Sequence, residues 1–110
     1  MKTAELTLDQ LDYWVAKAQS IDVWYPRDGE DLVYIAAPSL PPRKWKPTRY
    51  WSQGGPLIEQ ARIDLNWDVE GNHQWSASVE PDILAQGRTA LEAAMRAFVT
   101  ARFGAELNAA

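Results

Sequence analysis

Apolar residues between positions 7 and 20 recur with the period of an α-helix. The positions i, i+3, i+4 and i+7 of one helical face are occupied by Leu11, Trp14, Val15 and Ala18. Thr7 and Gln10 have the spacing of a capping box, in which a hydroxyl and a side-chain amide satisfy the first free backbone N–H groups. We therefore expect a helix that begins after Thr7 and ends near Gln19 or Ser20.

A second helical pattern lies near the end of the chain. Its wide apolar stripe consists of Leu91, Ala94, Met95, Phe98, Val99 and Phe103. Thr89 and Glu92 have the spacing of another capping box, and Gly104 is the kind of residue that commonly ends a helix. The pattern predicts a helix that starts at Thr89 and stops at Gly104, followed by a frayed tail over residues 105–110.

Alternation of apolar and polar residues predicts β-strands over 62–69 and 74–80. Turn-forming residues separate the two segments, so the strands should pair as an antiparallel hairpin. Trp67 and Trp75 lie on the apolar faces of the two strands, and we expect both indoles to pack in the core as a cross-strand pair. Residues 83–86 are expected to add a short edge strand.

Residues 21–56 have no long periodic pattern. A short extended piece over 21–25 and a brief strand over 32–35 are separated by a turn at 27–30. Four prolines then fall within ten residues: Pro38, Pro41, Pro42 and Pro47. Because proline lacks a backbone donor and disfavours helix at the preceding residue, we expect one long extended loop over 36–56.

Together these elements predict an α+β fold. Two helices pack on a small antiparallel sheet, in the order helix, long loop, β-hairpin or three-stranded sheet, helix. A chain of 110 residues is the size of one ordinary domain, so we expect residues 1–110 to form a single α+β domain.

Composition narrows the class of protein. Hydrophobic residues make up 46% of the chain and charged residues 24%, which is typical of a soluble globular protein. No apolar run approaches the ~18 residues of a membrane span, and residues 1–5 lack the apolar core of a signal peptide. We therefore expect a cytoplasmic protein with no membrane partner.

Few catalytic chemistries are open to this sequence. It has no cysteine, which excludes disulfides, thiolate nucleophiles and cysteine-based metal sites, and its one histidine cannot form a multi-histidine metal cage. That residue, His73, falls in a predicted turn and is expected to be solvated, as are Asp64 and Asp68 on the polar face of a strand. We predict no catalytic residue, no metal and no cofactor, and hence a protein that is not an enzyme.

Charge is distributed unevenly along the chain. The net charge of -4 opposes general binding of nucleic acid. Residues 32–58, however, contain no Asp or Glu, and the four cations in this segment are Arg43, Lys44, Lys46 and Arg49. The remainder of the chain therefore has a net charge of -8, so that one segment is basic and the rest acidic.

Four segments in the same order resemble a known family: residues 1–7, 11–18, 51–59 and 93–99. They resemble the NinX-like proteins of tailed bacteriophages and prophages, which are small accessory proteins of unknown activity. The Trp-x-Gln-Gly-Gly-Pro element that begins at Trp51 is the most specific of these motifs. The resemblance implies a phage or prophage origin, hence the cytoplasm of a host cell, and a role that is directed at the host or close to DNA metabolism. It implies no reaction, and it assigns no role to Arg43 or Lys44, because residues 36–48 differ from the family pattern.

The basic segment also carries the candidate site. It interleaves cations with flat rings and ends in glycines, a composition typical of a nucleotide pocket: cations meet phosphate, rings stack on a base, and glycine lets backbone N–H groups approach an anion. The ligand-binding residues predicted on this basis are Arg43, Lys44, Trp45, Arg49, Tyr50, Trp51, Gln53, Gly54 and Gly55. The leading hypothesis is a non-enzymatic binding module that sequesters a nucleotide-derived ligand, such as a host defence signal, with a homodimer as the expected assembly.

Other functions are left open. Trp24 and Tyr25 precede Pro26 in a loop, where exposed aromatic side chains often mark an interface, so with Trp51 they are candidate anchors of a module that inhibits or modulates a host enzyme. A reader of double-stranded RNA is suggested only by the order of helices and strands, and the net charge opposes it. The simplest alternative for residues 43–55 is a solvated loop whose tryptophans pack on the core.

Overall fold

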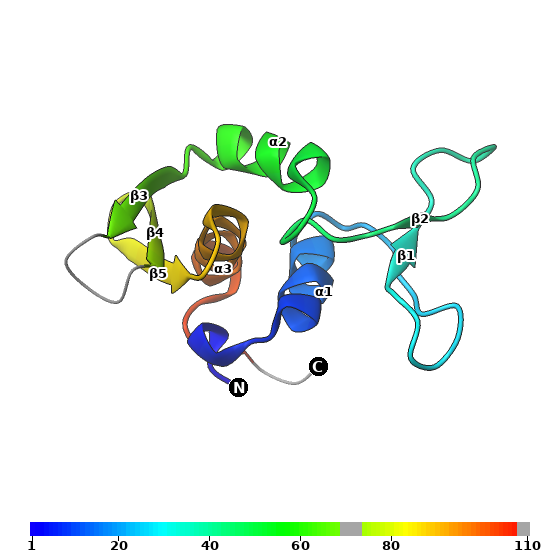
Figure 1. The fold of residues 1–110 in the computed structure, drawn as a ribbon, viewed down its shortest axis with the longest axis horizontal. Helices are drawn as coiled ribbons and strands as arrows, with labels where there is room; N and C mark the ends of the chain where they lie inside the picture. Colours follow the sequence, from blue (N-terminus) through cyan, green and yellow to red (C-terminus); the bar gives the residue numbers. More distant parts are fainter. Residues whose placement is uncertain (69–73, 108–110) are drawn as a thin grey trace.

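The computed structural model describes residues 1–68 and 74–107 (Figure 1). Along this part of the chain the elements are the 3₁₀ helix η1 (Thr3–Glu5), α1 (Leu8–Ala18), β1 (Val33–Tyr34), β2 (Arg43–Lys44), α2 (Trp51–Ala61), β3 (Asp64–Asp68), β4 (Gln74–Val79), β5 (Ile83–Gly87) and α3 (Ala90–Phe103). The fold is α+β, as predicted, with a two-stranded and a three-stranded antiparallel sheet. No helix in the described ranges is long and apolar enough to cross a membrane.

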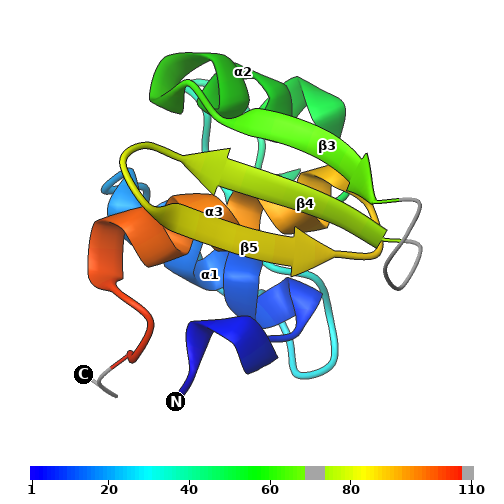
Figure 2. The same ribbon diagram turned by 90° about the vertical axis from the view of Figure 1, so that its left-hand side faces the viewer.

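The larger sheet has the order β3-β4-β5, and α3 packs across one of its faces (Figure 2). Trp67 pairs with Trp75 across β3 and β4, as predicted, and their ring centroids are 5.6 Å apart. Trp75 packs against the core, but Trp67 is 47% exposed, so the expectation of a core position is wrong for Trp67. The reason is its place on the edge strand β3, because α3 packs mainly against β4 and β5.

The starts of α1 and α3 follow the predicted capping. The Thr7 hydroxyl accepts from the Gln10 backbone N–H (3.2 Å), and the Gln10 side-chain carbonyl accepts from the Thr7 N–H (2.9 Å). At α3 the Thr89 hydroxyl accepts from the Glu92 N–H (3.0 Å), whereas the Glu92 carboxylate accepts from the N–H of Arg88 (2.7 Å), one residue earlier than in a capping box. Both helices end within two residues of their predicted ends.

Residues 51–61 form α2, which corrects the prediction of one long loop over 36–56. The helix depends on a close approach at Gly54, where an added Cβ would lie 2.3 Å from the Pro47 carbonyl oxygen and 2.7 Å from the Leu91 side chain. Glycine and proline both disfavour an isolated helix. Packing against distant residues therefore stabilises α2, and the local pattern does not contain that information.

The two ends of the described chain lie close together (Figure 1). The Leu107 N–H donates to the Met1 carbonyl and the Thr3 hydroxyl donates to the Gly104 carbonyl, both at 2.8 Å. Leu107 is also buried. The prediction of a frayed tail over 105–110 is therefore wrong as far as Leu107, because the pairing partner is at the other end of the sequence; the last three residues lie outside the described part.

The core lies between α1, α3 and the larger sheet, and its most buried large side chains include Leu11, Val15, Met95 and Val99. Residues 26–44, here called the arm, project from this body and contain β1 and β2 (Figure 1). The brief strand predicted over 32–35 is present as β1, which pairs with β2 on one side, while Trp24 forms a bridge to Val33. With the arm, the molecule measures 46 × 28 × 25 Å.

Candidate functional site

A buried carboxylate on α1 holds the predicted ligand segment in place. Asp12 is 1% exposed, and its Oδ1 accepts from both the backbone N–H (2.9 Å) and the hydroxyl (2.8 Å) of Thr48. Its Oδ2 lies 3.1 Å from the Arg49 guanidinium. Burial raises the pKa of Asp12, and the hydrogen bonds from Thr48 and Arg49 oppose that rise. Asp12 therefore ties α1 to residues 47–49.

Trp45 lies in the interior. It is 5% exposed, its indole N–H donates to the Asp12 backbone carbonyl at 2.8 Å, and its ring meets the Tyr34 ring edge-on at 5.0 Å. An indole held in this way anchors the C-terminal end of the arm on α1. Stacking of Trp45 on a ligand would require it to leave this position.

The predicted hydrogen-bonding groups of Gln53 are engaged within the chain. Its side-chain oxygen accepts from the Lys46 N–H (2.6 Å), and its side-chain amide donates to the Lys44 carbonyl (2.7 Å). Gly54 is buried and lies close to Pro47, while a Cβ added at Gly55 would meet only the Trp51 ring, at 3.7 Å. These residues fasten the first turns of α2 to the segment before it.

Three of the four cations in the basic segment are paired with carboxylates. Lys44 and Lys46 meet Asp31 at 3.2 and 2.9 Å, and the hydrogen bonds from Lys46 and then Lys44 lower the pKa of Asp31. Arg49 meets Asp9 at 2.6 Å as well as Asp12.

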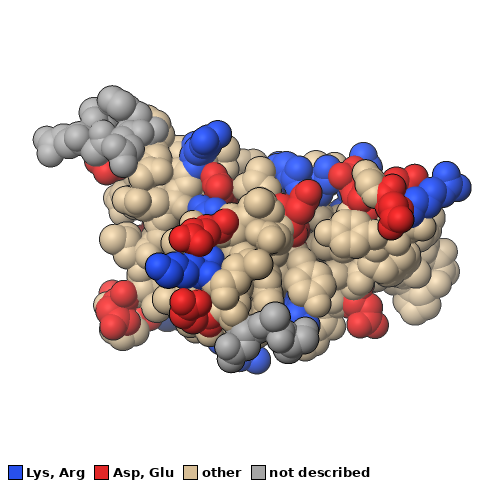
Figure 3. Space-filling view, turned by 90° about the horizontal axis from the view of Figure 1, so that it is seen from below, with Lys and Arg blue, Asp and Glu red and all other residues tan. Residues whose placement is uncertain are grey.

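The acidic partners of these cations all come from outside residues 32–58, so the charge asymmetry along the sequence is largely neutralised in space. Acidic and basic side chains alternate over the face shown in Figure 3, with no separate basic patch on that face. The exposed side chains that remain in the predicted segment include Arg43, Tyr50 (38%) and Trp51 (57%). The three cavities described below are not lined by any of residues 43–55.

Trp24 and Tyr25, the predicted interface residues, are 38% and 53% exposed. Trp24 lines a cavity of about 510 Å³ together with Tyr34 and Ile35, here called the Trp24 pocket. Tyr25 lines a second cavity of about 240 Å³, here called the Tyr25 pocket, with two rings of α1. Those rings belong to Tyr13 and Trp14, which meet at 88° with centroids 5.7 Å apart. Trp24 and Tyr25, which directly precede the arm and are here called the base of the arm, therefore line two different cavities.

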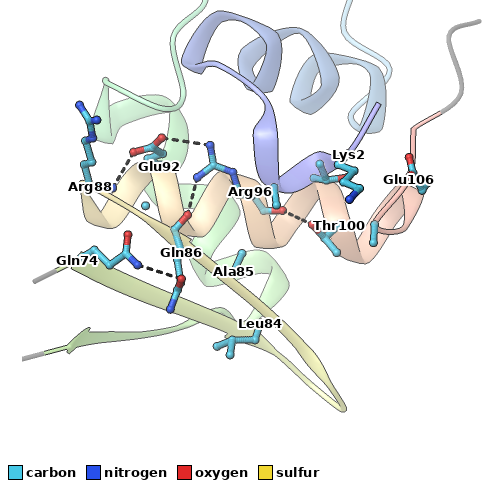
Figure 4. Close-up of a pocket in the computed structure, with 14 residues that line it drawn as sticks. Lys2, Gln74, Leu84, Ala85, Gln86, Arg88, Glu92, Arg96, Thr100 and Glu106 are labelled. Carbon is cyan, nitrogen blue, oxygen red and sulfur yellow. Dashed lines mark hydrogen bonds and ion pairs between the residues drawn. The ribbon is translucent and has the colours of Figure 1, made fainter. Parts of the chain in front are cut away.

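The largest of the three cavities, about 780 Å³, follows the outer edge of β5 and is here called the β5 groove (Figure 4). Arg96 of α3 lies at its floor and is 8% exposed. This guanidinium donates to the backbone carbonyls of Gln86 and Leu6 and pairs with Glu92 at 3.2 Å. The sequence analysis assigned no role to Arg96. The available signal was its position beside the apolar stripe of α3, because an arginine that is buried at such a position needs partners for its charge.

The family described as Bacteriophage P22, NinX matches residues 2–102. The chain belongs to this phage protein family. No curated protein is significantly similar to it. The NinX-like resemblance seen in the sequence is thus confirmed, and its most specific motif, which begins at Trp51, forms α2.

The acidic side chains of this NinX family chain are dispersed in the ranges that the structure describes. Those ranges contain no cluster of three or more His, Asp or Glu side chains that could hold a metal ion. Asp64 is exposed on the open face of the larger sheet. His73 lies outside the described residues.

Proposed function

We propose that this phage-family protein is a non-enzymatic binding module that recognises a partner protein through the base of its arm. The observation that carries the proposal is that Trp24 and Tyr25, adjacent in sequence, are both exposed and line separate cavities. A partner side chain in each cavity would bury the two aromatic rings at once.

The aromatic and apolar composition of this surface favours a protein as the occupant. Aromatic residues dominate the binding energy of protein interfaces, because a large rigid ring is desolvated at a low cost in conformational entropy. Ile35, which lines the Trp24 pocket, and Leu40 of the arm are also exposed, at 47% and 46%, and add to the apolar surface of this region. A surface of this composition is more typical of a protein interface than of a site for a charged small molecule.

The test compares two variants of the full chain in affinity purification from host-cell extract. Wild type and Trp51→Ser are expected to retain the same partner, while Trp24→Ser/Tyr25→Ser loses it. Titration with the purified partner should then show affinity at least about tenfold weaker for the double variant, as for loss of one interface anchor. Equal affinity of the double variant and wild type would overturn the proposal.

A nucleotide-like anion bound at residues 43–55 is the second candidate. It is supported by the exposed rings of Tyr50 and Trp51 and by the exposed side chain of Arg43. At least one member of a nucleotide panel should raise the melting temperature of wild type. Trp51→Ala should abolish that increase, and Trp24→Ser/Tyr25→Ser should leave it unchanged. Trp24→Ser/Tyr25→Ser therefore tests binding of a partner protein, and Trp51→Ala tests binding of a nucleotide.

A further inference from the structure

We propose that the β5 groove accepts an extended, acidic segment of a partner polypeptide as an additional β-strand beside β5. The proposal concerns a surface separate from the base of the arm and does not depend on the function proposed above. It starts from the position of β5, which has β4 on one side and no strand of the described chain on the other.

The backbone of β5 has groups directed into the groove. The Gln86 carbonyl accepts from Arg96, which lies on the open side of the strand (Figure 4). In an antiparallel strand the N–H and C=O of one residue point to the same side, and residues two apart repeat the direction. Leu84 therefore presents its backbone groups to the same side, and both residues line the groove.

The groove lies between β5, α3 and the start of the chain (Figure 4). One wall is β5, the floor includes Arg96 and Thr100 of α3, and the opposite wall is formed by residues 2–4 at the start of the chain. Its volume of about 780 Å³ is in the range of binding sites, and the five residues of β5 extend over about 17 Å. A segment of similar length would extend the sheet across α3.

The charges of the groove favour an acidic segment. Glu92 is paired with Arg96, and Glu106 is paired with the N-terminal amine at 3.5 Å. Lys2 and Arg88 are exposed at opposite ends of the groove, and neither side chain has an ion-pair partner among the described residues (Figure 4). Two cations therefore remain for carboxylates of an incoming strand.

The buried guanidinium of Arg96 has one donor that no group of the described residues accepts from. Its Nε is buried at the floor and has no hydrogen-bond partner in the described ranges. A buried donor without a partner is costly, so this guanidinium has hydrogen-bonding capacity that the chain itself does not use.

The test uses a fluorescein-labelled peptide of alternating Glu and Val, six residues long, with the Lys-Val peptide as its control. Fluorescence polarisation should show binding of the Glu-Val peptide to the full-length protein and no binding of the Lys-Val peptide. Lys2→Glu/Arg88→Glu should weaken binding about tenfold or more, because both ends of the site are reversed in charge. Absence of binding to wild type, or equal binding of both peptides, overturns the proposal.

A pair of substitutions at Leu84 tests whether the peptide adds as a strand. Leu84→Pro removes a backbone N–H directed into the groove without removing a bond to β4, and Leu84→Ala keeps that N–H. The alanine variant should bind like wild type and the proline variant about tenfold more weakly. Equal binding of the two variants contradicts strand addition.

Hydrogen exchange keeps the test decisive if Leu84→Pro does not fold, which circular dichroism would reveal. In wild type saturated with the Glu-Val peptide, the amides of Leu84 and Gln86 should exchange at least about tenfold more slowly. Unchanged exchange at both amides would rule out pairing with β5. Trp24→Ser/Tyr25→Ser should bind the peptide normally, which separates this site from the base of the arm.

Discussion

Asp12 is almost fully buried, and its contacts determine whether α1 and residues 47–49 stay together. The carboxylate satisfies two donors of Thr48 and pairs with Arg49, and the backbone carbonyl of the same residue accepts from Trp45. A buried charge of this kind is favourable only while its partners are present, because water cannot replace them.

Substitution of Asp12 tests this reading. Asp12→Ala should lower the free energy of unfolding by about 3 kcal/mol, because the N–H and hydroxyl of Thr48 would lose their partner in a buried site. Asp9 makes a matched control, since it binds the same Arg49 but is 70% exposed. Asp9→Ala should cost less than about 1 kcal/mol. Urea denaturation measures both; similar losses for the two variants would contradict the assignment.

Asp31 gives a prediction for pH. Lys46 and Lys44 hold the pKa of Asp31 below its ordinary value of 3.8, so the ionised carboxylate stabilises the fold above that pH. The contribution is lost as the pH falls through the lowered pKa of the folded state. Asp31→Asn should therefore be less stable than wild type at neutral pH, with the difference vanishing under strongly acidic conditions. Melting temperatures of both proteins, measured between pH 7 and about 2, test this prediction. A difference between wild type and Asp31→Asn that stays constant with pH would contradict it.

The sequence revealed the residue types of the candidate site but not how the chain uses them. Trp45, Gln53 and Arg49 stand close together in a basic, aromatic segment, as a ligand site requires. Trp45 and Arg49, however, bind Asp12 of α1, which lies more than thirty positions earlier in the sequence and which the fold brings near. Pairing between distant residues therefore decided which groups stay on the surface.

At the scale of elements, α2 differs from α1 and α3 in what stabilises it. Its Gly54, Gly55 and Pro56 would weaken a free helix, yet the close approach at Gly54 requires a residue without a side chain. The glycine that costs helix propensity is the one that allows α2 to pack.

Alanine at the two adjacent glycines should have opposite effects. Gly54→Ala should destabilise the protein by about 2 kcal/mol or more, because the new Cβ would overlap the backbone carbonyl of Pro47. Gly55→Ala should be neutral or stabilising by up to about 1 kcal/mol, since its Cβ meets only the Trp51 ring at 3.7 Å. Thermal unfolding of both variants, followed by circular dichroism, measures the two effects on stability. An equal loss of stability in Gly55→Ala and Gly54→Ala would contradict the prediction.

Local patterns were sufficient for most of the remaining elements. The capping residues Thr7 and Thr89 and the alternation around Trp67 depend on neighbours within a few positions, and the structure contains the corresponding helices and hairpin. The elements that local reasoning missed include α2 and the paired residues up to Leu107, which depend on contacts with residues distant in the sequence. Propensity predicts the first kind of element, and tertiary packing determines the second.

At the scale of the molecule, the body and the arm differ in how they are held. The body has a continuous core between its helices and sheet. Of the arm, Leu32 and the partly buried Tyr34 pack in that core, and other contacts of the arm are the short β1–β2 pairing and the ion pairs of Asp31. Segments with few buried apolar contacts open most readily, so the arm should be the least protected described region.

Limited proteolysis tests this difference. Trypsin should cut first after Arg27 or Arg43, whose side chains are exposed on the arm, well before any cut after the buried Arg96. Mass spectrometry of the early fragments identifies the site. A first cut within α1 or α3 would show instead that the body opens before the arm.

The contacts between the two ends of the chain give such a cut an unusual outcome. The piece before the cut contains α1 and the piece after it contains α3, and the two are joined through Thr3 with Gly104 and through Leu6 with Arg96. Severed in the arm, the protein should stay assembled, and two separately produced halves should reconstitute on mixing. The chain therefore offers a natural split point for a complementation reporter, in which each half is inert until it meets the other.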